Sequence, residues 1–71
     1  MRLLRKVRQD AGLNQREVAE RLKETVLFVS RCERGERRMD VVELIAFCAA
    51  IGKSPAEFMH DLTNAVERSQ G

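Results

Sequence analysis

The sequence predicts an all-α domain of five short helices, and three observations support this fold class. The chain has 71 residues, which is the length of a single domain. It contains one proline and four glycines, so it has few helix breakers. Apolar residues recur three and four positions apart in five segments, which is the spacing of one helix face. Polar residues that can cap helices precede four of these segments, and glycine follows three of them. We therefore expect one domain over residues 1–71, with its core between about residues 3 and 62.

The first two predicted helices span residues 2–11 and 15–22. Gly12 is placed to end the first helix, because glycine readily adopts the left-handed conformation found there. Asn14 is followed three positions later by Glu17, which is the spacing of a capping box at the start of the second helix. The faces expected to be buried contain Leu3, Leu4, Val7 and Ala11 in the first helix and Val18, Ala19 and Leu22 in the second.

The third predicted helix spans residues 26–34 and follows the second after a short connection, residues 23–25. Thr25 is placed to cap its start and Gly35 to end it. The residues expected to face the core are Val29, Cys32 and part of Phe28. Two short amphipathic helices joined by a tight connection have the layout of a helix-turn-helix, here about residues 15–34.

The last two predicted helices also have clear start signals. Asp40 and Glu43 form a second capping box before the fourth helix, which ends at Gly52. Ser54 followed by Pro55 marks the start of the fifth helix. The fourth helix is the most apolar, and its expected core-facing residues are Val41, Leu44, Ile45, Cys48 and Ile51.

The fifth helix has a longer apolar stripe than a small core needs, formed by Phe58, Met59, Leu62, Ala65 and Val66. This excess predicts contact with a second copy of the chain. The expected homodimer interface contains Phe58, Met59, Leu62 and Val66. Residues 69–71 are expected to be frayed.

The two halves of the chain differ in charge, and this difference bears on the binding partner. Residues 1–38 contain 11 basic and 6 acidic side chains, a net charge of +5, whereas residues 39–71 contain 2 basic and 5 acidic ones, a net charge of −3. A basic half of this kind indicates a surface that faces a polyanion such as nucleic acid.

Several other function classes find no support in the sequence. No apolar run is long enough to cross a membrane, and the expected location is the cytoplasm. Cys32 and Cys48 lack the spacing of a metal site or a disulfide framework, and we expect reduced thiols in the core. The single histidine, His60, has no nucleophile or paired carboxylate arranged around it. We expect no enzymatic activity, no metal and no cofactor.

The combination of motifs resembles the phage-repressor and Cro-like helix-turn-helix family, also called the XRE family of bacterial transcriptional regulators. The resemblance covers about residues 3–58. It rests on Arg8 before Gly12-Leu13, Leu13-Asn14-Gln15, Val18-Ala19, Val29-Ser30, Glu33-Arg34-Gly35 and the helix from Leu44 to Gly52. It implies a five-helix, lambda-repressor-like domain that binds double-stranded DNA sequence-specifically and in a repressor-like manner, with the third helix in the major groove. Because one such module contacts about half an operator, the second half-site is a further reason to expect a homodimer.

The pattern of this family places base readout on Val26, Leu27 and Arg31. Arg31 can donate two hydrogen bonds to a guanine, whereas Val26 and Leu27 can only contact thymine methyl groups. Many relatives have polar residues at these two positions. Two interpretations follow: the operator is recognised through thymine methyl groups, Arg31 and DNA shape, or the Val26-Leu27 pair contacts a protein partner, as in an antitoxin-like or anti-regulator module.

The expected contacts with the DNA backbone surround the third helix. Asn14 and Gln15 open the second helix, where backbone N–H groups favour an anion. The full set expected at the backbone is Asn14, Gln15, Thr25, Ser30, Arg34, Arg37 and Arg38, with Arg5 and Lys6 as weaker candidates. The resemblance also implies an internal ion pair between Arg8 and Glu33.

Overall fold

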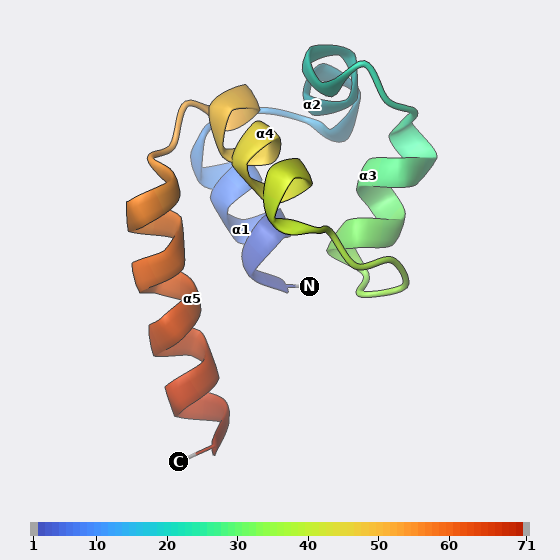
Figure 1. Ribbon diagram of the computed structural model, residues 1–71. Coiled ribbons are helices and arrows are strands. Elements are labelled where there is room, and N and C mark those ends of the chain that lie inside the picture. The colour runs from blue at the N-terminus through green and yellow to red at the C-terminus, as the bar shows by residue number, and fades with distance from the viewer. Residues whose placement is uncertain (1, 71) are drawn as a thin grey trace.

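The computed structural model describes the backbone of residues 2–70 and the side chains of residues 2–68. Its five helices are α1 (Arg2–Asp10), α2 (Gln15–Leu22), α3 (Val26–Glu33), α4 (Val41–Ile51) and α5 (Pro55–Gln70), and this described part contains no strand. Figure 1 shows α4 between α5 on one side and the α2–α3 pair on the other. The predicted all-α class and all five helices are confirmed.

Both predicted capping boxes are present. Asn14 Oδ1 accepts the backbone N–H of Glu17 at 2.8 Å, and Glu17 Oε1 accepts the N–H of Asn14 at 3.1 Å. Asp40 and Glu43 make the same two bonds at 2.7 and 3.1 Å. These side chains satisfy helix N–H groups that have no partner within the helix. Short-range sequence signals therefore define where α2 and α4 begin.

The core is formed where α1, α2, α3, α4 and α5 meet. Two phenylalanines, Phe47 and Phe58, are completely buried in it. The buried apolar residues are Leu4, Val7, Val18, Ala19, Val29, Cys32, Phe47, Cys48, Ala50, Ile51 and Phe58. Burial of each large side chain contributes about 1.5 to 3 kcal/mol of transfer free energy, so this cluster is the main source of stability.

The inward face predicted for α4 is partly wrong. Cys48 and Ile51 are buried, but Val41 and Ile45 are exposed, and Phe47 and Ala50 occupy the core instead. Because α4 is apolar on nearly every side, its periodicity alone cannot show which side is buried. Packing against the neighbouring helices α2 and α5 decides this.

Helix α5 also differs from its predicted role. Phe58, expected at a dimer interface, is completely buried within the chain, and Leu62 packs against the same core. Met59 and Val66 are about half exposed. The far end of α5 extends away from the other helices (Figure 1). The helix reaches Gln70 and so includes two of the three residues expected to fray, while Gly71 lies outside the described residues.

Candidate nucleic-acid interface

A buried ion pair joins the first and third helices. Arg8 Nε lies 2.6 Å from Glu33 Oε2, and Arg8 Nη2 donates to Glu33 Oε1 at 3.1 Å. The two side chains are only 8% and 2% exposed. Arg8 Nη1 also donates to the carbonyl oxygen of Leu13 at 2.9 Å, and the amide of Gln15 donates to Glu33 Oε1 at 3.2 Å. One guanidinium–carboxylate pair thus holds the end of α1, the start of α2 and the end of α3 in a defined arrangement.

The connection between α2 and α3 is tight and contains a strained residue. Lys23 has φ of 57° and ψ of 40°, a left-handed conformation usually taken by glycine. The next residue, Glu24, donates its N–H to the carbonyl oxygen of Ala19 at 2.9 Å. Thr25 Oγ1 then accepts the N–H of Phe28 at 3.0 Å, so its hydroxyl caps α3. This turn sets the angle between the two helices of the motif.

The outer face of α3 carries the three residues predicted to contact bases. Val26 and Leu27 are 42% and 52% exposed, and Arg31 is exposed one turn further along. Within residues 2–68, the Arg31 side chain makes no hydrogen bond or ion pair. Ser30, predicted to contact the DNA backbone, is half-buried on the same helix. An exposed arginine with no partner among the described residues therefore lies beside two apolar side chains on this face.

A shallow hollow of about 510 Å³ lies at the start of α2. Its lining includes Asn14, Gln15, Arg16 and Val26, together with the edge of Arg8. The Oδ1 atom of Asn14 caps α2, and the Gln15 amide donates one hydrogen bond to Glu33, so each amide group retains an N–H for an external acceptor. The sequence prediction did not include Arg16. Its position directly after Gln15, in the first turn of a helix, was the available signal.

Arg37 has a different environment from the one expected. Its guanidinium lies 3.0 Å from Glu43 Oε2 and 4.5 Å from the centre of the Phe28 ring, and Nη1 donates to the carbonyl oxygen of Arg38 at 3.0 Å. The hydrogen bond to Glu43 raises the pKa of Arg37, and the same contact lowers the pKa of the Glu43 carboxyl. Arg37 thus connects the loop after α3 to the first turn of α4.

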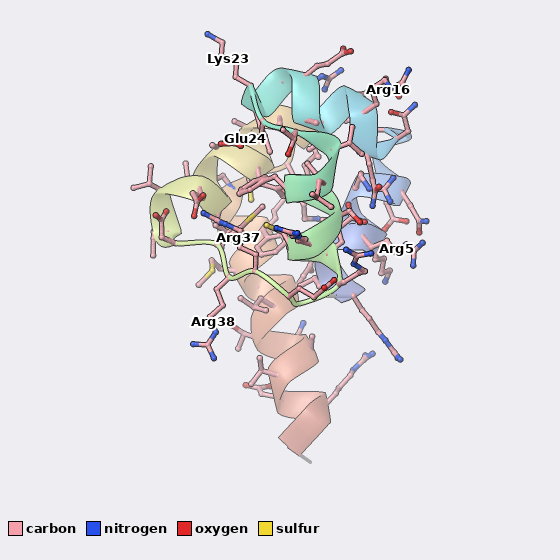
Figure 2. The ribbon with its side chains drawn as sticks, turned by 90° about the vertical axis from the view of Figure 1, so that its right-hand side faces the viewer. Arg5, Arg16, Lys23, Glu24, Arg37 and Arg38 are labelled. Atoms are coloured by element: carbon pink, nitrogen blue, oxygen red, sulfur yellow. The ribbon has the colours of Figure 1, made fainter. Side chains whose placement is uncertain are left out.

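The other two arginines predicted near the DNA backbone differ from each other. Arg34 forms an ion pair with Glu36 at 2.5 Å, in which both side chains are more than half exposed. The exposed Arg38 side chain makes no hydrogen bond or ion pair with any described residue. Figure 2 shows Arg38 pointing outward below Arg37, on the opposite side of α3 from Arg5 and Arg16. Basic side chains therefore lie on both flanks of α3.

Two further features concern chemistry other than binding. Cys32 and Cys48 are buried cysteines that are not joined in a disulfide, and burial raises the pKa of each thiol. In the part of the chain that the structure describes, no group of three histidine, cysteine, aspartate or glutamate side chains is arranged as metal ligands. Among the same residues, no helix is both long and apolar enough to cross a membrane.

Two helices at a fixed angle, with an exposed outer helix flanked by arginines, define a helix-turn-helix domain of the type that binds DNA. The chain belongs to the helix-turn-helix domain family of XRE type: the family model described as "Helix-turn-helix domain" matches residues 2–60. A comparison with the curated proteins gives no match.

Solved structures that resemble this one include the following three. An XRE-family-like protein from Pseudomonas syringae pv. tomato str. DC3000 is 41% identical, with 89% of this chain and 79% of that chain covered and a TM-score of 0.79. The clp gene regulator ClgR from C. glutamicum is 30% identical, with coverages of 89% and 82% and a TM-score of 0.83. A point mutant of the restriction-modification controller protein C.Esp1396I is 22% identical, with coverages of 90% and 81% and a TM-score of 0.83, and shows a shared fold.

Proposed function

We propose that this chain is a repressor-like regulator that binds a specific double-stranded operator in the cytoplasm, with α3 in the major groove and no catalytic activity of its own. DNA-binding transcriptional regulation is the function of its family. The observation that carries the finer proposal is the exposed face of α3, where Arg31, which has no partner within residues 2–68, adjoins Val26 and Leu27. The buried Arg8–Glu33 pair holds this face against the rest of the domain.

The proposed contacts divide by chemistry. Arg31 donates two hydrogen bonds to a guanine, and Val26 and Leu27 pack against thymine methyl groups. These contacts carry the sequence preference. Because two of the three residues offer no donor or acceptor, DNA shape contributes the remainder of the specificity.

Contacts with the DNA backbone position the domain on the duplex. The N-terminus of α2 supplies N–H groups, with the amides of Asn14 and Gln15 and the guanidinium of Arg16 beside them. On the other flank, Arg38 reaches a phosphate directly and Arg34 exchanges its exposed partner Glu36 for a phosphate. The proposed backbone residues are Asn14, Gln15, Arg16, Thr25, Ser30, Arg34 and Arg38.

Arg37 takes a different role in this proposal. It is held by Glu43 and by the Phe28 ring, so a contact with phosphate would compete with an existing ion pair. We propose that Arg37 positions the loop that carries Arg38, and that its own charge adds less to DNA affinity than that of Arg38.

The alternative, a protein-interaction module that uses the Val26-Leu27 surface, is less well supported. That surface consists of two apolar side chains beside Arg31 and Arg16. A patch this small and this basic suits a nucleic acid better than an apolar protein partner. The comparisons also favour DNA-binding regulation over this alternative.

The first prediction concerns the salt dependence of DNA binding. If one domain contacts about four phosphates, log K should fall with log salt concentration with a slope of about −3.6, because each contact releases counterions. Arg16→Gln with Arg38→Gln should make this slope shallower by about two units. Fluorescence anisotropy with a labelled duplex at several salt concentrations measures both slopes. Absence of binding to any duplex at low salt would overturn the proposed function.

We further propose that the chain acts as a homodimer, since one module contacts about half of an operator and two-fold symmetry places a second module about 34 Å away. The exposed apolar side chains available for this contact lie on two helices that pack against each other. They are Val41, Val42 and Ile45 on α4 and Met59 and Val66 on α5.

The second prediction tests this assembly. Wild-type protein should dimerise at high micromolar concentration, and Met59→Glu with Val66→Glu should shift it toward monomer, because each change places a charge in an apolar contact. Asn64→Glu adds a charge on the side of α5 that faces α1 and serves as the control. Sedimentation equilibrium measures all three proteins. A purely monomeric wild type without DNA would count against the dimer.

A further inference from the structure

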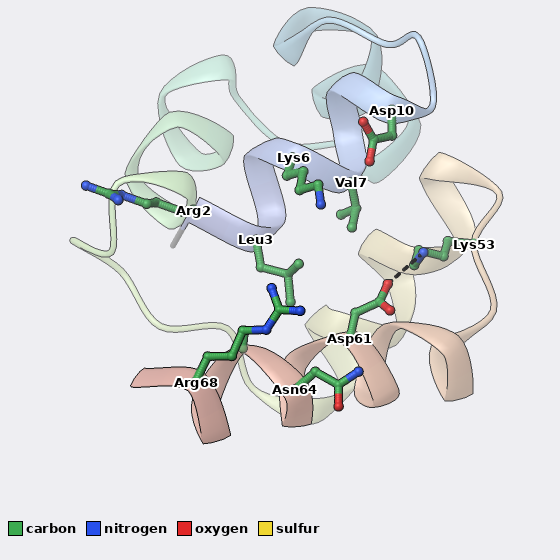
Figure 3. Close-up of a pocket in the computed structure, with 10 residues that line it drawn as sticks. Arg2, Leu3, Lys6, Val7, Asp10, Lys53, Asp61, Asn64 and Arg68 are labelled. Atoms are coloured by element: carbon green, nitrogen blue, oxygen red, sulfur yellow. Dashed lines mark ion pairs between the residues drawn. The ribbon is translucent and has the colours of Figure 1, made fainter. Parts of the chain in front are cut away.

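A hollow of about 550 Å³ lies between α1 and α5. Figure 3 shows Leu3 and Val7 on the α1 side of this hollow and Asp61, Asn64 and Arg68 on the α5 side. No residue of α3 lines it, so it is separate from the surface proposed to bind DNA. Its volume lies within the range of about 300 to 1,000 Å³ that is usual for small-molecule sites.

Basic side chains enter this hollow from both helices. Lys6 comes from α1 and Arg68 from α5, and in Figure 3 their charged ends point toward the space between the helices. Neither side chain forms an ion pair or hydrogen bond with another described residue. Arg2 also belongs to the lining, but Figure 3 shows its guanidinium pointing away from the space between the helices. Two unpaired cations that converge from opposite walls form a suitable environment for an anion.

Among the described residues, the acidic side chains of the hollow form no ion pair with Lys6 or Arg68. Asp61 Oδ2 lies 3.0 Å from Lys53 Nζ, and this contact is the main reason that the pKa of Lys53 is raised. Figure 3 shows this pair on the opposite side of the hollow from Arg68. Asp10 is one helical turn from Lys6, but the two side chains form no ion pair in the described part of the chain. The hollow is therefore more positive toward Arg68 than toward Lys53.

We propose that this hollow, which we call the α1–α5 groove, binds a small molecule that carries a carboxylate or phosphate group. The anionic group lies between Lys6 and Arg68, and the carbon skeleton of the ligand lies over Leu3, Val7 and Ala65. The Asn64 side chain also lines the groove, and its Nδ2 lies 3.4 Å from His60 Nε2.

Such a ligand would connect α1 to the part of α5 that extends away from the other helices (Figure 1). Because it would contact only the folded chain, it would also raise the thermal unfolding temperature. The inference does not depend on DNA binding, and a chain that bound no DNA could still bind this ligand.

The third prediction is that a simple anion binds in the α1–α5 groove. It is tested by titrating ¹⁵N-labelled protein with citrate and, separately, with inorganic phosphate, at constant ionic strength set by chloride. The amide signals of Leu3, Val7, Ala65 and Arg68 should shift along a saturating one-site curve for at least one anion. Tighter binding of citrate would identify a carboxylate ligand, and tighter binding of phosphate a phosphorylated one.

Matched variants make this test specific. Lys6→Gln and Arg68→Gln should each weaken the binding about tenfold, since each removes a charge-assisted hydrogen bond. Arg5→Gln removes the same charge from the neighbouring position of α1, which does not line the groove, and should leave the affinity unchanged. All three side chains are exposed, and the chemical shifts of core residues report whether each variant is folded.

Three results would overturn the proposal. The first is a set of shifts that rises linearly at every basic residue without saturation. The second is a set of saturating amide shifts confined to residues around the hollow at the start of α2, which would mean that only the DNA-facing surface binds anions. The third is an equal loss of affinity in Arg5→Gln and Lys6→Gln, which would reflect net charge rather than a site.

Discussion

Replacing Glu33 with alanine is expected to lower the free energy of unfolding by about 3 to 5 kcal/mol, because it leaves the Arg8 guanidinium buried without its carboxylate partner. Both side chains are less than a tenth exposed, so water cannot take the place of the missing partner. The change also removes the acceptor for the Gln15 amide. Urea unfolding followed by far-ultraviolet circular dichroism measures this loss, which would leave a domain of this size only marginally folded.

Two further variants distinguish the cost of an unpaired buried charge from the cost of losing an ion pair. Glu36→Ala breaks the exposed ion pair with Arg34 and should change stability by at most about 1 kcal/mol. Replacing Arg8 with methionine and Glu33 with leucine together should cost less than Glu33→Ala alone, because no unpaired charge remains in the interior. A loss below about 1 kcal/mol for Glu33→Ala would show that the pair does not hold α1 and α3 together.

Replacing Arg31 with alanine is expected to reduce discrimination at one operator base pair by about 1 to 3 kcal/mol, which is the contribution of a bidentate arginine–guanine contact. Affinity for duplexes already altered at that base pair should change much less. The operator is first obtained by selecting bound duplexes from a random pool. Dissociation constants for that operator and its single-base variants then give the discrimination at each position.

Arg38→Ala is the comparison for this experiment. Because the proposed partner of Arg38 is a phosphate, its loss should weaken binding to all duplexes by the same factor and make the salt slope shallower by about one unit. Arg37→Ala should change the salt slope less than Arg38→Ala, since Arg37 is already paired with Glu43. Equal losses on every duplex from Arg31→Ala and Arg38→Ala would refute the assignment of Arg31 to base readout.

The local signals of the sequence were reliable predictors of structure. Capping residues at Asn14, Thr25 and Asp40 each form the expected hydrogen bonds. Gly12, Gly35 and Gly52 all take positive φ angles after helices. These features depend on residues a few positions apart, so the sequence contains nearly all the information that determines them.

Features that depend on the packing of distant segments were harder to predict. Arg21 Nη1 donates to the carbonyl oxygen of Ala50 at 2.6 Å and so links α2 to α4, a contact that no local pattern indicated. Lys23 takes a left-handed conformation without being glycine, because the short connection between α2 and α3 requires it. Arg37 was predicted from its position to contact phosphate, and in the fold its partly exposed guanidinium also pairs with Glu43 and lies over the Phe28 ring.

In the candidate site, too, some features were predictable from the local sequence and others required the folded structure. Helical spacing and the helix-turn-helix pattern were enough to identify the exposed face of α3, with Val26, Leu27 and Arg31, and the start of α2 beside it. The three-dimensional arrangement was needed to distinguish unpaired arginines from those already in contact with a carboxylate. It was also needed to show that Phe47 and Phe58 fill the core and that a basic groove separates α1 from α5. Helix caps and helix faces arise from neighbours in sequence, whereas ion pairs, burial and grooves arise from segments that meet only when the chain folds.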